Sequence, residues 1–100
     1  MVQATTPRFV LELPDTVDLT QAANVYFALK QMNVLIEKST ADLTVDTHTV
    51  CVALSQAETL RLATGRARIQ LNWTYEDGTR ACTNIVTVNV LQNLMMEVLA

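Results

Sequence analysis

The residues that could perform acid–base chemistry are few, and the single histidine is the first of them. His48 lies among threonines at the start of an expected strand, with Asp46 two residues before it. An imidazole acts as a general base when a nucleophile and an orienting carboxylate lie within hydrogen-bond reach. Asp46 would share the strand face of His48, but no Ser or Cys motif accompanies the two. We therefore interpret His48 as a surface residue and expect no catalytic residue and no enzyme activity.

Two pairs of aspartates could supply oxygen ligands to a calcium ion. Asp15 and Asp18 form one pair, and Asp42 and Asp46 form the other. Neither pair has the dense alternating carboxylates and the glycine of a calcium-binding loop. Aspartates in loops commonly accept hydrogen bonds from nearby backbone N–H groups. We expect these residues to have turn and cap roles, and we predict no metal site.

The two cysteines, Cys51 and Cys82, are too few for a disulfide framework and lack the paired spacing of a zinc site. Trp73 lies between them, an order also found in antibody domains. There, however, the tryptophan follows the first cysteine closely and the second cysteine comes far later. We expect both cysteines to be reduced, packed thiols, and Trp73 to be a core residue that faces inward.

The composition argues against several classes of ligand. The two glycines lie in turn contexts, so no phosphate-binding loop and no nucleotide cofactor are expected. A chain of 100 residues is too small for a deep substrate cleft, so no small-molecule substrate is expected. A net charge of −3 argues against nucleic acid, because phosphate binding needs clustered Lys and Arg. Arg66 and Arg68, with Arg61 nearby, could form a local basic patch, which we interpret as a solvated face. Aromatic residues are 5% of the chain, too few for sugar stacking, although Tyr26 is expected to be exposed.

The amino terminus, Met1 to Arg8, lacks a basic region followed by an apolar run, so we do not interpret it as a secretory signal. No stretch approaches the ~20 apolar residues that a membrane-spanning helix needs. We expect no membrane partner, and synthesis in a cytoplasm where the chain stays until it is assembled.

Stepwise alternation of polar and apolar residues predicts the strands that would position all of these groups. In Arg66 to Tyr75, the side chains of Ala67, Ile69, Leu71 and Trp73 share one face, which predicts a half-buried strand. Asp77-Gly78 follows and predicts a tight turn in which both residues adopt positive φ angles. Ala81 to Leu91 then predicts a partner run with Cys82, Val86, Val88 and Val90 on one face.

The first half of the chain predicts further strands, separated by turn residues. They are expected at Phe9–Leu13 as an edge strand ended by Pro14, at Asn24–Lys30 and Val34–Lys38 as a hairpin, at Leu43–Val45 as a short strand, and at Thr49–Leu54. Ser55 and Glu58 fit a capping box that begins at most one helical turn, which would carry the chain between two sheets.

These elements predict one domain over residues 1–100, an all-β, antiparallel, immunoglobulin-like β-sandwich of six to eight short strands. Val25, Phe27, Val50, Val52, Val86 and Val88 are expected to complete its core. Half of the residues are hydrophobic and 17% are charged, so we expect part of the surface to be covered by a partner.

The order of these elements resembles small virion proteins of tailed phages, in particular the immunoglobulin-like amino-terminal domains of phage baseplate upper proteins. The resemblance covers about residues 9 to 99. It is carried by Val25-Tyr-Phe-Ala-Leu-Lys-Gln31, Val34-Leu-Ile-Glu-Lys38, Val50-Cys-Val-Ala-Leu-Ser-Gln-Ala-Glu-Thr59, Gly65 to Trp73 with Asp77-Gly78, Arg80, and Val86-Thr-Val-Asn-Val90. It implies a non-enzymatic structural component of a bacteriophage virion, in the baseplate, tail or neck or as a decoration of the capsid. The long extension that follows the first domain of baseplate proteins is not present in this sequence.

Two function classes follow for such a domain. One is a virion subunit whose partners are other virion proteins and copies of itself, in a homo-oligomer. The alternative is an independent surface- or glycan-binding adhesin module. The apolar segment 92–100 favours the first, because its large side chains cannot all enter one small core. We predict an assembly interface formed by Leu94, Met95, Met96, Val98 and Leu99. The alternative for this segment is that it folds back as a last strand or cap.

Overall fold

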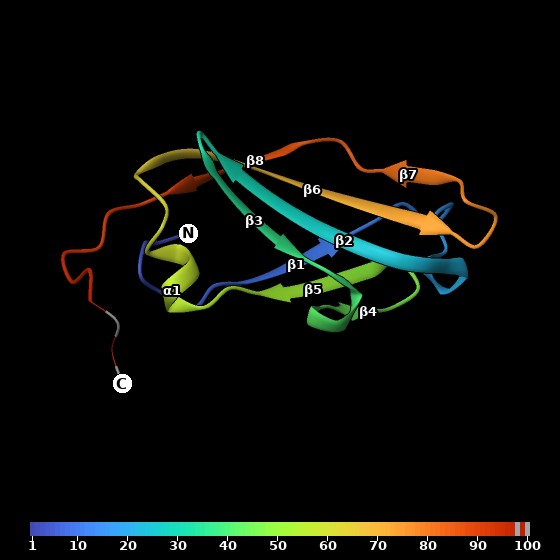
Figure 1. Ribbon diagram of the computed structural model, residues 1–100, viewed down its shortest axis with the longest axis horizontal. Helices are drawn as coiled ribbons and strands as arrows, with labels where there is room; N and C mark the ends of the chain where they lie inside the picture. The colour runs from blue at the N-terminus through green and yellow to red at the C-terminus, as the bar shows by residue number, and fades with distance from the viewer. Residues whose placement is uncertain (98, 100) are drawn as a thin grey trace.

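The protein folds as eight short strands and one turn of α-helix in the part of the chain that the computed structural model describes, residues 1–97 and 99 (Figure 1). The strands are β1 (Arg8–Glu12), β2 (Ala22–Gln31), β3 (Val34–Lys38), β4 (Thr44–Val45), β5 (Thr49–Ala53), β6 (Gly65–Tyr75), β7 (Arg80–Cys82) and β8 (Val86–Val90). The helical turn α1 is Gln56–Thr59, and two 3-10 turns are Leu19–Gln21 and Thr40–Asp42.

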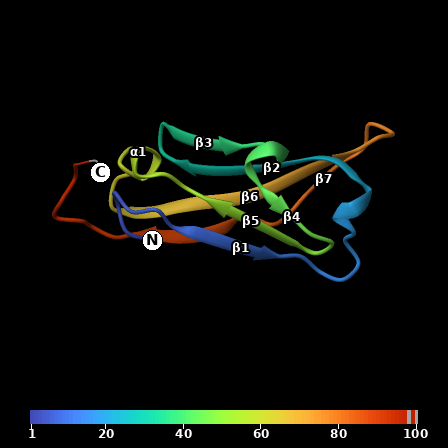
Figure 2. The same cartoon turned by 90° about the horizontal axis from the view of Figure 1, so that it is seen from below.

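The strands form two antiparallel sheets. The smaller sheet has the order β1-β5-β4, and the larger has the order β3-β2-β6, with β7 and β8 sharing the remaining edge of β6. In Figure 1 the larger sheet lies in the upper part of the view and the smaller in the lower part. Figure 2, turned to view the molecule from below, brings the smaller sheet to the front. The predicted all-β, antiparallel class is confirmed.

The core lies between the two sheets and is built from alternate residues of the long strands. The inward positions of β6, from Ala67 to Trp73, are buried, which confirms the predicted strand face. The predicted core residues on β2 and β5 are also buried: Val25, Phe27, Val50 and Val52. Leu29 and Ile36 add to this cluster from β2 and β3. The two sheets therefore pack face to face, as sandwich layers do.

The link between the sheets is the predicted helical turn. The Ser55 hydroxyl accepts a hydrogen bond from the Glu58 N–H at 3.1 Å, and a Glu58 carboxylate oxygen accepts one from the Ser55 N–H at 2.9 Å. This capping box satisfies two backbone donors that the helix itself leaves free. It begins α1, which connects β5 of the smaller sheet to β6 of the larger one, as expected.

The turn after β6 differs from the prediction in one detail. The Gly78 N–H donates to the Tyr75 carbonyl at 3.0 Å, and the Tyr75 N–H donates to the Thr79 carbonyl at 2.9 Å. Gly78 has a φ of +88°, whereas Asp77 is not among the residues with positive φ. The loop is therefore a three-residue connection ending in a left-handed glycine, and the prediction of positive φ at both Asp77 and Gly78 is wrong.

The partner run after this turn is two strands rather than one, and the break reverses the expected side-chain parity. Cys82 pairs with Asn72, whereas Val86 pairs with Ile69, so one extra residue lies between the two registers. At the break, the Thr83 hydroxyl accepts from the Leu71 N–H at 3.1 Å. Because an inserted residue flips every later side chain to the other face, Cys82 points outward while Val86 shares the inner face of Ile69.

Two expectations for this edge are therefore corrected. Cys82 is an exposed thiol rather than a packed one, although both cysteines are free, as predicted. Val86 has the predicted inward parity but is 50% exposed, so its assignment to the core is wrong, and Val88 is only partly buried. The physical reason is that the three-stranded sheet is narrower than the larger sheet and leaves Val86 uncovered.

Candidate functional site

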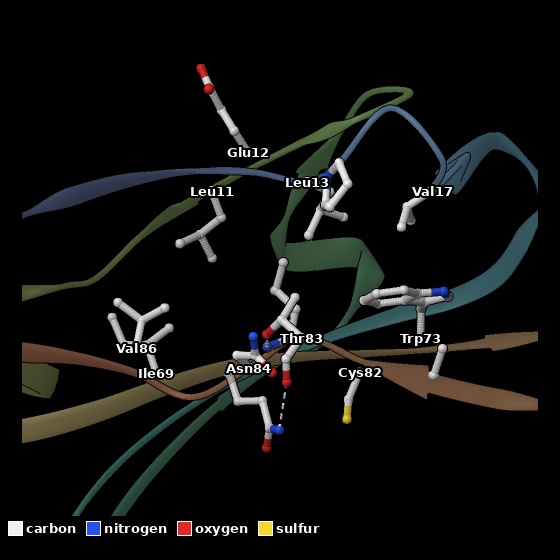
Figure 3. Close-up of a pocket in the computed structure, with 14 residues that line it drawn as sticks. Leu11, Glu12, Leu13, Val17, Ile69, Trp73, Cys82, Thr83, Asn84 and Val86 are labelled. Carbon is white, nitrogen blue, oxygen red and sulfur yellow. Dashed lines mark hydrogen bonds between the residues drawn. The ribbon is translucent and has the colours of Figure 1, made fainter.

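The uncovered strip forms an open apolar groove at one side of the sandwich, with a volume of about 510 Å³. Its upper wall comes from the end of β1 and the segment that follows, and its lower wall comes from β6, β7 and β8. Figure 3 shows Leu11, Leu13 and Val17 above the groove and Trp73 and Val86 below it. Ala81 also lines the lower wall. Sequence reasoning missed this groove, because it depends on the unequal widths of the two sheets.

Several polar groups of the groove are engaged in hydrogen bonds within the protein. The Gln70 amide donates to the Thr83 carbonyl at 2.9 Å, and the Trp73 indole N–H donates to the Tyr75 hydroxyl at 3.0 Å. Glu12 and Cys82 contribute to the lining, but Figure 3 shows their side chains pointing away from Leu11 and Leu13. The groove thus offers apolar contact rather than acid–base chemistry.

Strand β1 forms the rim of the groove and is a free edge, as predicted from Pro14. It pairs with β5 on one side only. The Leu13 N–H donates to the His48 carbonyl at 2.8 Å, and the Pro7 carbonyl accepts from the Leu54 N–H at 3.0 Å. In an antiparallel ladder, hydrogen-bonded and non-hydrogen-bonded residue pairs alternate along each strand. The odd-numbered residues of β1 therefore direct their backbone N–H and C=O groups to β5. The N–H and C=O groups of Val10 and Glu12 therefore point to the open edge.

The predicted assembly interface lies on the exposed chain that follows β8. The exposed fractions are 91% for Leu94, 59% for Met95, 41% for Met96 and 52% for Leu99, while Val98 lies outside the described residues. Within those residues the last strand is β8, so the described segment has not folded back as a strand. An interface requires exposed side chains of this kind. The interface itself stays a prediction.

The end of this segment is held near α1. The Leu99 N–H donates to the Gln56 side-chain oxygen at 2.8 Å, and the Gln56 amide donates to the Leu99 carbonyl at 3.0 Å. Nearer to β8, the Asn93 amide donates to the Gln3 carbonyl at 2.9 Å. These polar contacts fix the backbone at two points and leave the large apolar side chains uncovered.

The outer face of the larger sheet carries a small cluster of cations. Lys30 and Arg68 are direct cross-strand neighbours on β2 and β6, and Arg66 lies two residues before Arg68. Arg61 instead reaches the edge of β3, where its guanidinium donates to the Leu35 carbonyl at 3.3 Å. Like charges directly opposite each other destabilise a sheet. Sequence reasoning found Arg66 and Arg68 but missed Lys30, because the pairing of β2 with β6 is not visible in the sequence.

The predicted chemical candidates have structural contacts. The His48 Nδ1–H donates to the Val17 carbonyl and helps to fix the loop after β1. The Asp46 carboxylate accepts from the Thr47 N–H at 2.8 Å. His48 and Asp46 therefore each bond to a backbone group, in place of the relay that a general base would need.

Asp18 and Asp42 act as caps, as expected. The Asp18 carboxylate accepts from the Thr20 hydroxyl and from the Thr20 N–H at 2.9 Å, and these hydrogen bonds hold the pKa of Asp18 below its usual range. The Asp42 carboxylate accepts from the Ser39 N–H at 3.2 Å. Among the described residues, no three His, Cys, Asp or Glu side chains lie together as a metal site would require.

Comparisons with protein-family models, with curated proteins and with solved structures found no match to this chain. Among the described residues, no helix is long and apolar enough to cross a membrane. The resemblance to phage virion proteins therefore stays a prediction. The exposed surfaces described above are the structural basis for proposing a function.

Proposed function

We propose that this chain is a non-enzymatic structural subunit of a bacteriophage virion, which acts through contacts with other virion proteins and with copies of itself. Its place in the virion would be the baseplate, tail, neck or capsid surface. The virion assignment rests on the sequence resemblance, whereas the assembly role rests on the surface of the protein.

The observation that carries the proposal is the amount of large apolar side chain left in water. Leu94, Met95, Met96 and Leu99 are exposed at the carboxyl end, and Val86 is exposed in the groove. Covering one such side chain contributes roughly 1.5–3 kcal/mol. Small folded domains rarely leave several of these groups together in water unless a partner covers them. Flexible methionines adapt their shape to the surface of a neighbour.

The test replaces two apolar residues of the segment in the full chain, Met96→Asp with Val98→Asp. We measure mass by light scattering, thermal stability, and incorporation into particles when the chain is produced with the other virion proteins. Gln92→Asp, at an exposed polar position, is the matched control for an added charge. The proposal predicts that the double variant melts like the wild type and fails to enter particles, while Gln92→Asp enters normally.

Two results would contradict the proposal. A double variant that melts early but still enters particles would show that the segment serves the stability of its own domain. A wild-type chain that never enters particles and instead binds glycans would favour the adhesin alternative.

A further inference from the structure

We infer that the groove beside β1 receives the carboxyl-terminal segment 94–99 of a second copy of this chain, which adds to the free edge of β1 as an extended strand. This inference rests on the proposed function and deepens it, because it names the partner and the contact. Strand addition to an open sheet edge is a general mode of protein recognition, in which main-chain hydrogen bonds supply affinity and side-chain pockets supply specificity.

The edge of β1 can accept a strand without rearrangement. The backbone groups of Val10 and Glu12 point to the open side, as the β1–β5 register shows. The side chain of Val10 is 57% exposed on the outer face of the smaller sheet, so it leaves this side of the strand open. Unpaired edges of this kind readily template pairing with another chain.

The lower wall of the groove is wide enough to be covered by one more strand. Val86 lies on the inner face of the larger sheet, opposite Ile69, but no strand of the smaller sheet lies over it. Strands in a sheet lie about 4.8 Å apart, so a strand added to β1 extends the smaller sheet by one position toward β8. The added strand would cover Val86 and Ala81, and its inward side chains would complete the core at this side.

The segment 94–99 has the pattern that such a strand needs. Leu94, Met96 and Val98 alternate along the chain and are all apolar, and the other face carries Met95, Glu97 and Leu99. In an extended strand these three residues span four steps of about 3.3 Å, or about 13 Å. The β1 wall of the groove, from Leu11 to Pro14, spans three such steps, or about 10 Å if extended.

The occupant comes from a second copy because of where the segment leaves the sandwich. Strand β8 begins beside the groove at Val86 and runs away from it, and Leu99 is held by Gln56 of α1. Figure 1 shows α1 and the carboxyl end together on one side of the molecule, with β7 on the other side. Pairing of this segment with a second copy requires the two hydrogen bonds between Leu99 and Gln56 to open. A segment at one end and a groove near the other form a head-to-tail contact, which builds rings or filaments when it repeats in one direction.

The test uses two variants of the full chain that each disable one half of the contact. Met96→Asp places a charge on the apolar face of the segment, and Gln92→Asp, which adds the same charge at an exposed polar position outside the segment, is its control. Val86→Asp places a charge on the floor of the groove, and Thr87→Asp, on the outer face of the same strand, is its control. Light scattering gives the mass of each protein over a range of concentrations, and circular dichroism checks that each is folded.

We expect wild type, Gln92→Asp and Thr87→Asp to associate, and Met96→Asp and Val86→Asp to stay monomeric. A mixture of the two monomeric variants is the decisive sample, because one keeps a working groove and the other a working segment. It should form one-to-one heterodimers of twice the monomer mass and nothing larger. Val10→Pro tests the edge of β1 independently, because it removes one outward N–H and leaves the hydrogen bonds to β5 in place. This variant should also be monomeric.

The outcomes separate this inference from the proposed function. A wild-type chain that stays monomeric at every concentration but enters particles would overturn the second copy as the occupant and leave the virion role intact. Association that survives Val86→Asp and Val10→Pro, or a mixture that stays monomeric, would also overturn the inference. A wild-type chain that neither associates nor enters particles would overturn both.

Discussion

Replacing Trp73 by alanine tests the packing of the two sheets most severely. The side chain is 4% exposed, and its indole N–H donates to the Tyr75 hydroxyl at 3.0 Å. A buried tryptophan removes about 150–250 Å² from water, which at about 25 cal/mol per Å² corresponds to about 4–6 kcal/mol. This is an upper limit, because the unfolded chain already buries part of that area.

Two features of the site refine this figure. Trp73 lines the groove, so water can enter part of the volume that the ring vacates, and the cost of a sealed cavity is reduced. Loss of the indole donor leaves the partly buried Tyr75 hydroxyl to bond with water. We therefore expect Trp73→Ala to lower the free energy of unfolding by about 3–5 kcal/mol, a large share of the roughly 5–15 kcal/mol of a small domain.

The assay is urea denaturation followed by far-UV circular dichroism, because Trp73 is the only tryptophan and its fluorescence is lost with the ring. Trp73→Phe keeps an aromatic ring and should cost less than Trp73→Ala. Tyr26→Ala, on the outer face of β2 where the side chain is 42% exposed, should cost less than about 1 kcal/mol. A Trp73→Ala loss below about 1 kcal/mol would refute the inward packing of β6.

Three further predictions concern separate parts of the chain. Cys51 and Cys82 are free, so thiol titration under denaturing, non-reducing conditions should find both reactive, and a need for reductant would contradict this. Met32 has a φ of +48° and is 76% exposed, so Met32→Gly should stabilise the β2–β3 hairpin by about 0.5–1 kcal/mol in thermal melts, and a loss would contradict the turn geometry. Burial opposes ionisation of Glu58, but hydrogen bonds from Lys38 and the Ser55 N–H prevail and lower its pKa below the ordinary 4.5. The stability from Glu58 is therefore full above pH 4.5 and is lost as pH falls through the lowered pKa. The advantage of wild type over Glu58→Gln should therefore shrink as pH falls below 4.5, and a constant difference would argue against this ion pair.

The strands of the first 80 residues were predictable because the alternation of apolar and polar residues within each strand identifies its buried face. Alternation in β2, β5 and β6 gave the correct inward residues, and the capping box at Ser55 and Glu58 gave α1 within one turn. Turn residues supplied the ends of these strands. All of these signals act over a few residues, so they can be read without knowledge of the tertiary structure.

The errors arose where the outcome depends on a partner strand. The extra residue near Thr83 reverses the parity of the run after β7, and nothing in the local alternation marks it. The exposure of Val86 depends on how far the smaller sheet extends, which is a property of the whole sandwich. The same limit hid the pairing of Lys30 with Arg68 and the groove beside β1.

The exposure of the apolar segment after β8 was predictable in part. Leu94, Met95 and Met96 were identified because five large apolar side chains within six residues exceed what one small core can accept. The groove beside β1 could not be found in this way, because it is formed by β1 and β8, which are far apart in the sequence and lie on different sheets.

Amide hydrogen exchange at the edge of β1 shows directly whether a strand from a second copy pairs there. The N–H groups of Val10 and Glu12 face the open side of the groove and should exchange rapidly in the monomeric Met96→Asp variant. In the associated wild-type protein a strand from a second copy would bond to them, so both should exchange much more slowly, while the Leu13 N–H, bonded to the His48 carbonyl in both forms, should not change. Association of the wild-type chain with rapid exchange retained at both Val10 and Glu12 would contradict the account.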